Sequence, residues 1–391
     1  MSSSHRALNR NYDVVVAGAR AAGAATAMLL ARAGLRVLVV DRGRYGADTL
    51  STHALMRGAV IQLHRWGLLD HIVAADTPAI TRTTFRYGAE TIDIPIKPSH
   101  GVDALYAPRR TVLDRVLVDA AAAAGADVSY GVTVTDVQRD RHGRLAGILG
   151  RDGSGRPVTV DASLVIGADG MRSTVARHVA APVEWRGSGA SAVTYGYWSD
   201  LETNGYEWIF RPDACAGVIP TNGGMACVFG AASPRRVGRG GPSVLLSVLR
   251  EACPETAARV QAATLATGVR TFTGHPGFVR RAWGHGWALV GDAGYWKDPL
   301  SAHGLTDALR DAELLARAVL ASASGEVGEA EAFDRYQVTR DQLSMPLCRI
   351  TDEIATQRWT DATIGELLIQ LSAAMGDEID TLVGLDALAV L

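Results

Sequence analysis

Residues 13–42 read DVVVAGARAAGAATAMLLARAGLRVLVVDR and contain the signals that decide the fold. The apolar run 13–17 predicts a buried strand, and the Ala-rich run 22–34 predicts a helix that ends at its last glycine. A second apolar run then leads to Asp41, as expected for a strand parallel to the first. Together these segments predict one βαβ unit, which crosses over in the right-handed sense.

The turn between the first strand and the helix carries most of the G-x-G-x-x-G fingerprint of dinucleotide-binding units. Gly18 permits the tight turn, Gly23 permits close packing of the helix on the strand, and the first N–H groups of the helix can face a pyrophosphate. Asp41 can accept hydrogen bonds from ribose hydroxyls. The alternative is a βαβ unit that binds nothing at this turn.

Arg20 stands where the fingerprint has its second glycine. Its side chain either points away while its N–H faces the phosphates, which we favour, or adds a cation to them.

The composition is that of an ordinary globular protein, with 48% hydrophobic and 20% charged residues. A length of 391 residues predicts two interlocked domains. The net charge of −2 gives no electrostatic case for nucleic acid binding. We find neither a signal peptide nor an apolar run that could span a bilayer, and the four cysteines show no metal-ligand spacing, so we expect a cytoplasmic protein with reduced thiols and no metal centre.

Residues 164–179, LVIGADGMRSTVARHV, predict a strand that ends at Asp169-Gly170 and a helix that begins near Ser173. A carboxylate at this place can organise the loop, and the serine can cap the helix. Taken locally, a strand–turn–helix without any ligand is an equally fair interpretation.

Residues 288–319 predict a buried strand that delivers Gly291-Asp292, a loop with Pro299, and a long helix opened by Ala302-His303-Gly304. The N-terminus of a helix offers N–H groups and a positive dipole to a developing anion. A reduced isoalloxazine carries its negative charge at the N1/C2-oxygen edge, which gives a physical reason for small residues at this helix start.

In this order, the three stretches resemble the FAD-dependent monooxygenases of the p-hydroxybenzoate hydroxylase fold, also called group A, with geranylgeranyl reductases and flavin-dependent halogenases as more distant relatives. Arg110-Thr111-Val112-Leu113 is similar to the family's Arg-x-x-Leu helix, Asp169-Gly170 to its DG motif and Gly291-Asp292 to its GD motif. The resemblance covers residues 12 to about 345.

The resemblance implies FAD as cofactor. Asp41 is similar to the acid that holds the adenosine ribose, Asp292 to the acid that binds the ribityl chain, and Pro299 to the proline beside the flavin ring. The full set of expected cofactor contacts is Gly18, Ala22, Gly23, Asp41, Arg42, Arg109, Arg110, Val134, Asp169, Asp292, Pro299, His303 and Gly304.

Four positions depart from the family pattern G-D-A-A-H-x-x-P-P-x-x-G-Q-G, with Tyr295 for His, Asp298 for the first Pro, Ala302 for Gly and His303 for Gln. Because these positions are expected to line the flavin pocket, the resemblance does not extend to the substrate.

We expect His303, Pro299 and His53 to act in catalysis. His303 would lie at the helix start, where its charge can respond to pH. His53 lies in the stretch 48–58, expected to run beneath the FAD, and the alternative for it is a helix-terminal histidine bonded to backbone. Lys297, one of only two lysines, is either a titratable charge in the flavin loop or a solvated loop residue.

A predicted β-sheet should roof the flavin and hold the substrate. Its strands place Tyr197, Trp208 and Phe210 as substrate candidates, with Trp296 from the flavin loop. Tyr195 and Ile219 are further candidates, and packing within the sheet is the alternative for each aromatic side chain.

The sequence therefore predicts an α/β fold, with a Rossmann-like FAD-binding domain, an inserted antiparallel β-sheet substrate domain and a helical C-terminus. The FAD-binding domain is assigned to residues 12–75, 100–182 and 280–325, the substrate domain to 76–99 and 183–279, and the C-terminal helices to 326–391. No second G-x-G-x-x-G unit follows, so hydride would come from transiently bound NAD(P)H, through a partner flavin reductase, or from the substrate itself.

The function that the resemblance implies is monooxygenation of an apolar or aromatic small molecule through a flavin C4a-hydroperoxide, as in secondary metabolism. The alternatives are an FAD-dependent reductase or dehydrogenase of the geranylgeranyl-reductase type, a halogenase, and a flavin-binding sensor without turnover. The halogenase signature Trp-x-Trp-x-Ile-Pro is absent, and the complete set of flavin motifs disfavours a sensor.

Overall fold

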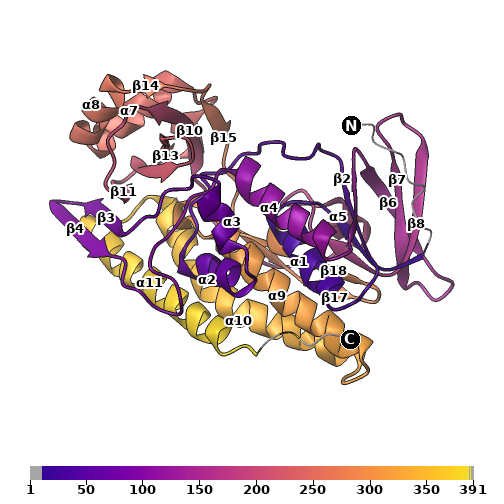
Figure 1. Cartoon of the computed structure of the whole chain (residues 1–391). Helices are drawn as coiled ribbons and strands as arrows, with labels where there is room; N and C mark the ends of the chain where they lie inside the picture. Colours follow the sequence, from indigo (N-terminus) through magenta and orange to yellow (C-terminus); the bar gives the residue numbers. More distant parts are fainter. Residues whose placement is uncertain (1–10, 387, 389–391) are drawn as a thin grey trace.

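The computed structural model describes residues 11–386 and 388, so the N-terminal segment 1–10 and the last part of the segment 326–391 lie outside it. Its central sheet is parallel along the path β18-β8-β1-β2-β5 (Figure 1). These strands are β18 (Trp287–Leu289), β8 (Pro157–Gly167), β1 (Asn11–Ala17), β2 (Val37–Asp41) and β5 (Asp127–Tyr130). The βαβ unit and its neighbours therefore form the expected Rossmann-like sheet.

The sheet is completed by antiparallel strands and covered by helices. The strands are β6 (Thr133–Arg139), β7 (Leu145–Arg151) and β17 (Trp283–Gly284). The helices are α1 (Ala21–Arg32), α4 (Arg110–Ala123), α5 (Thr174–His178) and α9 (Gly304–Ala323). Helix α1 packs against both α4 and α9, which brings the N-termini of these helices toward the carboxyl ends of the parallel strands.

A second sheet runs in the order β14-β10-β13-β12-β11-β3-β4, with β15 beside β10. Its strands are β3 (Arg82–Tyr87), β4 (Glu90–Pro95), β10 (Ala192–Ser199), β11 (Tyr206–Phe210), β12 (Cys215–Thr221), β13 (Met225–Ala232), β14 (Thr264–Leu265) and β15 (Arg270–Phe272). The hairpin β3–β4 and the four strands β10–β13 appear where the sequence predicts them, although β3 pairs with β11 in parallel.

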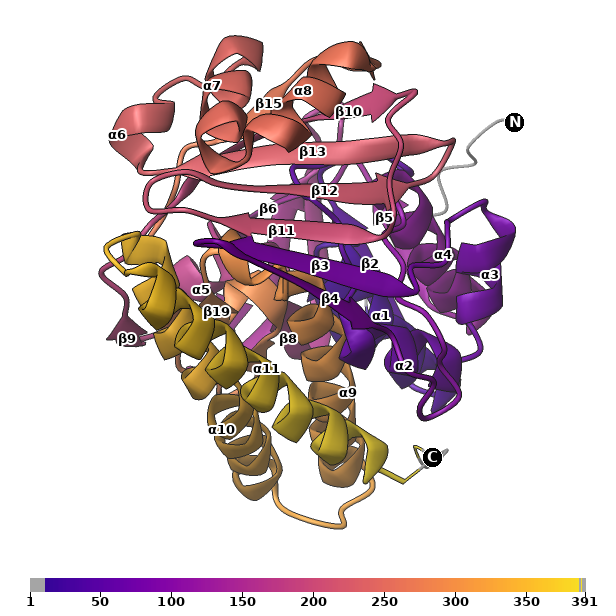
Figure 2. The ribbon, with the colours of Figure 1, turned by 90° about the vertical axis from the view of Figure 1, so that its left-hand side faces the viewer.

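Three helices lie within residues 234–262, a part of the segment 183–279 for which the sequence predicts a β-sheet. They are α6 (Pro234–Val237), α7 (Pro242–Ala252) and α8 (Pro254–Ala262). Figure 2 shows α7 and α8 on the outer face of the sheet β10–β13. Their apolar residues, such as Leu245 and Val248, pack on that face, and each helix has a proline in its first turn, where proline is favourable.

The C-terminal part is helical, as expected, with α10 (Glu329–Thr356) and α11 (Asp361–Val383) packed against each other. Helix α11 also contacts α2 (Arg57–Arg65), which is followed by α3 (Leu69–Ala74) after the break at Gly67. Figure 2 shows α11 beginning beside the hairpin β3–β4 and running from there past α9. Helix α2 begins only at Arg57, because the residues before it follow the cavity described below.

A small third sheet consists of β9 (Val183–Arg186), β16 (Phe278–Arg280) and β19 (Tyr295–Trp296). Its strand β19 belongs to the segment that follows β18. Two short 3-10 helices, η1 (Gly291–Ala293) and η2 (Pro299–Ser301), lead from β18 to α9. Among the described residues, no helix combines the length and the apolar character that crossing a bilayer requires.

Candidate functional site

A cavity of about 660 Å³ lies at the carboxyl ends of the parallel strands and extends beneath the second sheet. Its lining comes from the turn after β1, the end of β2, residues 49–54, the DG motif and the segment 291–308, with Val193, Tyr195 and Phe272 from the second sheet. In an open α/β sheet, this edge is where ligands bind.

The turn after β1 has the geometry that the fingerprint requires. Gly18 has φ +111°, and a Cβ on it would lie 2.3 Å from the carbonyl oxygen of Ala168, so only glycine fits. A Cβ on Gly23 would lie 1.9 Å from the carbonyl oxygen of Gly18. These two glycines therefore let α1 begin directly beside β1 and β8.

Asp41 lies at the end of β2 and borders the cavity. Its carboxylate accepts hydrogen bonds from the backbone N–H groups of Ala19, at 2.8 Å, and Gly43, at 2.6 Å. Each carboxylate oxygen can accept a further bond. The carboxylate is thus held in place and can still bind ribose hydroxyls.

Asp169 organises the loop of the DG motif. Its carboxylate accepts hydrogen bonds from the Ser173 hydroxyl at 2.5 Å and from the Thr174 N–H at 2.6 Å. Ser173 in turn caps α5 by accepting from the Ala176 N–H at 2.9 Å. The serine is therefore a helix cap, as a purely structural interpretation predicts, and the aspartate also borders the cavity.

Asp292 and the start of α9 form the far end of the cavity. Burial raises the pKa of Asp292 to about 6, against the opposing effect of Arg110 and Lys297. Pro299 begins η2, and Gly304 is the first residue of α9. A Cβ on Gly304 would meet no atom within 4 Å, so the backbone at the helix start is open to a ligand.

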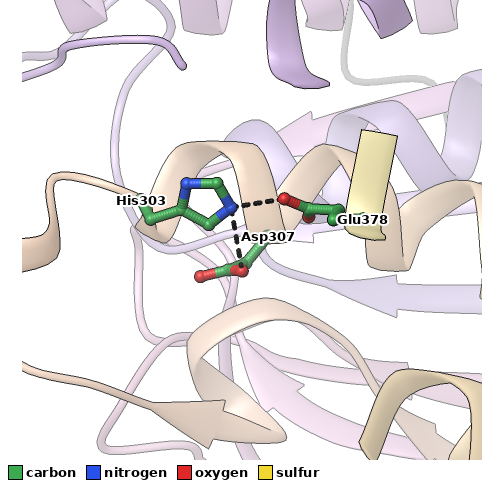
Figure 3. A group of neighbouring side chains, drawn as sticks. All are labelled: His303, Asp307 and Glu378. Atoms are coloured by element: carbon green, nitrogen blue, oxygen red, sulfur yellow. Dashed lines mark hydrogen bonds and ion pairs between the residues drawn. The ribbon is translucent and has the colours of Figure 1, made fainter. Parts of the chain in front are cut away.

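His303 is fully buried at the N-terminus of α9 and belongs to a group of buried charges (Figure 3). Its Nε2 lies 2.5 Å from Glu378 Oε2 on α11 and 3.8 Å from Asp307 Oδ1. Burial lowers the pKa of His303, while the neighbouring Glu378 opposes this shift. A neutral imidazole that donates from Nε2 to Glu378 follows from these contacts.

Glu378, Asp307 and His303 could together offer ligands to a metal ion. Two cations already neutralise these carboxylates, because Lys297 is paired with Asp307 and Arg310 Nη1 lies 3.1 Å from Glu378 Oε1. The group is therefore best described as a buried ion-pair network.

Lys297 is buried in the cavity wall, so the interpretation as a solvated loop residue is wrong. Burial lowers the pKa of Lys297 to about 8. Its partner Asp307 lies on the first turn of α9, a contact that no short-range pattern in the sequence indicates.

His53 borders the cavity from a left-handed backbone conformation with φ +50°, and not from a helix. Its Nδ1 lies 3.2 Å from the carbonyl oxygen of Ala107, and its Nε2 lies 3.1 Å from the Tyr197 hydroxyl. Since a carbonyl only accepts, Nδ1 carries the proton and Tyr197 donates to Nε2. Burial and then Arg109 lower the pKa of His53 to about 3, which keeps the ring neutral.

Three aromatic side chains form the wall beneath the second sheet: Tyr195 on β10, Phe272 on β15 and Trp296 on β19. The rings of Phe272 and Trp296 are 5.4 Å apart. Tyr195 anchors the loop opposite, because its hydroxyl accepts from the Ser51 N–H at 3.1 Å. This wall makes one side of the cavity largely apolar.

Most residues proposed from the sequence border this cavity. They are Gly18, Ala22, Asp41, Arg42, His53, Arg110, Val134, Asp169, Asp292, Trp296, Pro299, His303 and Gly304. Gly23, Arg109, Tyr197, Trp208 and Phe210 lie outside the lining. Among them, Arg109 covers the Tyr197 ring at 4.2 Å, Trp208 packs on Tyr206, and Phe210 packs on Trp359.

Sequence reasoning missed several contributors, among them Phe272 in the cavity wall and Glu378, which lies outside the lining and contacts His303. Phe272 lies on a three-residue strand, too short for a periodic pattern, and Glu378 is one acid among several on an amphipathic helix. Neither position carries a local signal, because each reaches the site through the packing of a distant segment.

The residues at the cavity fit FAD. Two helix N-termini supply N–H groups, Arg110 supplies a cation, and Asp41 and Asp292 supply acceptors for hydroxyl groups. The open backbone at Gly304 leaves room for a planar ring beside the start of α9.

Three curated proteins illustrate the relatives. A menaquinone reductase from Mycolicibacterium smegmatis is 35% identical over 173 residues, which cover 44% of this chain and 40% of that protein. A digeranylgeranylglycerophospholipid reductase from Methanothermobacter thermautotrophicus is 29% identical over 337 residues, or 84% and 82% of the two chains. A 6-methylpretetramide 4-monooxygenase from Streptomyces rimosus is 32% identical over 168 residues, or 42% and 29%. The chain thus spans less than half of the first and third relatives.

A solved structure agrees on the fold. The flavin-dependent brominase Bmp2 superimposes with a TM-score of 0.79 at 18% identity, covering 96% of this chain and 93% of that chain. Residues 11–351 match the family described as "FAD binding domain". With most of its length in that match and its cavity built from the same motifs, the chain belongs to this family of FAD-dependent oxidoreductases.

Proposed function

We propose that the protein is an FAD-dependent monooxygenase that hydroxylates an apolar or aromatic small molecule. The observation that carries this proposal is the wall of Tyr195, Phe272 and Trp296, which faces the same cavity as Pro299 and the start of α9. Bound FAD, once reduced, supplies the activation of O2. The aromatic wall excludes water and offers flat surfaces on which an aromatic substrate can stack.

The residues around the cavity have distinct proposed roles. With FAD bound, the N–H groups at the start of α9 would stabilise negative charge on the flavin ring, and Pro299 would contribute to the wall that holds this ring. His303 and His53 would take part in catalysis as neutral imidazoles. A hydrogen bond to Glu378 holds His303, and hydrogen bonds to Ala107 and Tyr197 hold His53. Tyr197 is accordingly a positioning residue in this proposal, because its hydroxyl is used by His53.

The electron donor in this proposal is NAD(P)H, bound transiently or used through a partner flavin reductase. We also propose that the protein is located in the cytoplasm and acts in secondary metabolism. The assigned domain boundaries likewise remain a prediction.

The first prediction concerns the cofactor. The purified protein should be yellow and should release FAD on denaturation, because the βαβ unit with Asp41 serves the adenosine half of the molecule, which FMN lacks. Chromatography of the released flavin checks this. Release of FMN, or failure of the apoprotein to take up added FAD, would contradict the assignment of the cavity.

The second prediction tests oxygen transfer. Among aromatic candidate substrates, such as polyketides, at least one should speed NAD(P)H oxidation or, with a flavin reductase present, O2 consumption. The product should be heavier than the substrate by one oxygen atom. An oxygen electrode measures the consumption of O2, and mass spectrometry measures the mass of the product.

Matched variants of two tryptophans test whether the substrate binds against the aromatic wall. Trp296 borders the cavity, whereas Trp283 packs on Phe333. The two are otherwise similar, because the indole N–H of Trp296 donates to the His275 carbonyl oxygen at 3.2 Å and that of Trp283 donates to Asp334 at 3.2 Å. We expect Trp296→Phe to raise KM about threefold, because the smaller ring gives up part of an aromatic contact worth about 1 kcal/mol. Trp283→Phe should leave KM unchanged, and equal effects of the two variants would count against the aromatic wall.

The second candidate function is an FAD-dependent reductase. It is favoured by the digeranylgeranylglycerophospholipid reductase, since that relative aligns over 84% of this chain. Under anaerobic conditions a reductase would convert its substrate to a product heavier by two hydrogen atoms. Substrate-dependent O2 uptake with no such anaerobic product separates the two functions.

A further inference from the structure

The backbone at Arg20 has no need of a glycine. Arg20 is the residue that precedes α1, with φ −95° and ψ −172°, an extended conformation that any residue adopts. Gly18, in contrast, has φ +111°. The replacement of the second glycine therefore costs no backbone strain, and only the direction of the side chain matters.

The Arg20 side chain does not point away from the cavity. Its Nη1 lies 3.4 Å from Asp114 Oδ2, and Asp114 also holds Arg110 through three contacts of 2.8–3.1 Å. Both arginines border the cavity, and each stands at the N-terminal end of a helix, α1 for Arg20 and α4 for Arg110. One buried carboxylate thus holds two guanidinium groups between two helix N-termini.

The charges at this place favour an anion. Arg20, Arg110 and Asp114 together carry a net positive charge, and the dipoles of α1 and α4 add to it. Asp41 and Asp169 also border the cavity, and they would repel a pyrophosphate in the absence of these cations. The Arg20 side chain remains 38% exposed, so it retains donors that Asp114 does not use.

We propose that Arg20 is a ligand of the FAD pyrophosphate, held in position by Asp114, and that it compensates for the missing second glycine by adding a charged hydrogen bond. A guanidinium forms strong, often paired, hydrogen bonds with phosphate oxygens. This inference concerns cofactor binding alone and does not depend on which oxidation the protein catalyses.

The experiment compares three ligands on the apoprotein: FAD, ADP, which has the pyrophosphate without the flavin, and riboflavin, which has the flavin without phosphate. Quenching of flavin fluorescence gives Kd for FAD and riboflavin, and calorimetry gives Kd for ADP. We expect Arg20→Ala and Arg20→Gly to weaken FAD and ADP about tenfold, or about 1.4 kcal/mol, and to leave riboflavin unchanged. The loss should shrink as salt is raised.

Controls separate a ligand from a structural residue. Arg36→Ala removes an arginine of the same βαβ unit that is paired with Asp13 on the surface, and it should change none of the three affinities. Arg20→Lys should retain part of the affinity that Arg20→Gln loses, and this pair carries the test if the smaller variants do not fold. The proposal is overturned if Arg20→Gly binds FAD as tightly as the parent protein, or if riboflavin weakens as much as FAD.

Discussion

Replacing Arg310 by methionine should lower the free energy of unfolding by about 3–5 kcal/mol at pH 7, the range expected when one partner of a buried ion pair is removed. Arg310 is fully buried, and its guanidinium donates to Glu378 at 3.1 Å, Tyr295 at 2.7 Å and Ser344 at 2.8 Å. It also pairs with Asp311 at 2.7 Å. Methionine fills similar space but leaves three buried carboxylates, those of Glu378, Asp311 and Asp307, without this partner. Urea unfolding monitored by circular dichroism measures the loss.

The pH dependence of that loss follows from Glu378. Although burial opposes ionisation, the charge of Arg310 and the hydrogen bond from His303 hold the pKa of Glu378 at about 2, below its ordinary value of 4.5. In the parent protein this group contributes stability above pH 4.5, and that stability is lost as the pH falls toward 2. In the variant the folded pKa should rise, so the deficit should shrink between pH 7 and pH 4.5 as the carboxylate gains a proton.

Two further variants define the network. Arg310→Met combined with Glu378→Gln should cost less than the sum of the single changes, because the second removes the charge that the first strands. Arg36→Met, which breaks an exposed pair, should have little effect. A deficit that does not depend on pH, with strictly additive single changes, would mean that Arg310 acts by packing alone.

Gly23→Ala should destabilise the protein by about 3 kcal/mol and abolish retention of FAD through purification. The added Cβ would lie 1.9 Å from the Gly18 carbonyl oxygen and 3.0 Å from the Ala168 Cβ. Because both contacts lie on the closely packed strands β1 and β8 and the turns that follow them, α1 would have to move, and overpacking of this kind costs about 1–3 kcal/mol. The FAD content, from the ratio of flavin to protein absorbance, and urea unfolding check both effects.

Gly376 provides the matched control. It is also helical, on α11, and a Cβ there would meet no atom within 4 Å. Gly376→Ala should therefore stabilise the protein by about 0.5–1 kcal/mol, the usual gain for a helix interior. A Gly23→Ala protein that keeps both its stability and its FAD would show that close packing at the turn is not needed.

Local patterns were sufficient to group one set of predicted residues around the cavity. Gly18, Asp41, Asp169 and Asp292 each stand at the end of a strand, and parallel strands deliver their carboxyl ends to one edge. Their grouping around one cavity is therefore encoded within short segments of sequence. The strands β10–β13 follow equally from alternation and turns.

Other expectations were wrong because long-range packing overrides local signals. Lys297 lies in a loop, where a solvated side chain is the alternative, yet it is buried beside Asp307, and α10 packs against η2 at the end of this loop. A helix-terminal position is the alternative for His53, yet its backbone is left-handed, and its ring forms a hydrogen bond with Tyr197, 144 residues away. The helices α7 and α8 follow a strand-rich stretch, and their role is to cover the outer face of a sheet that they do not extend.

The sequence by itself determined the family, the Rossmann-like unit and the cofactor class, because strand ends and glycine turns depend on residues that are neighbours along the chain. Only the tertiary structure decided the direction of the Arg20 side chain, the partner of His303 and the aromatic wall. Asp114 lies 94 residues from Arg20, and Glu378 lies 75 residues from His303. The contacts of a buried charge are chosen by whichever segments pack over it, since an unpaired charge in the interior is too costly to leave, and no local pattern records that choice.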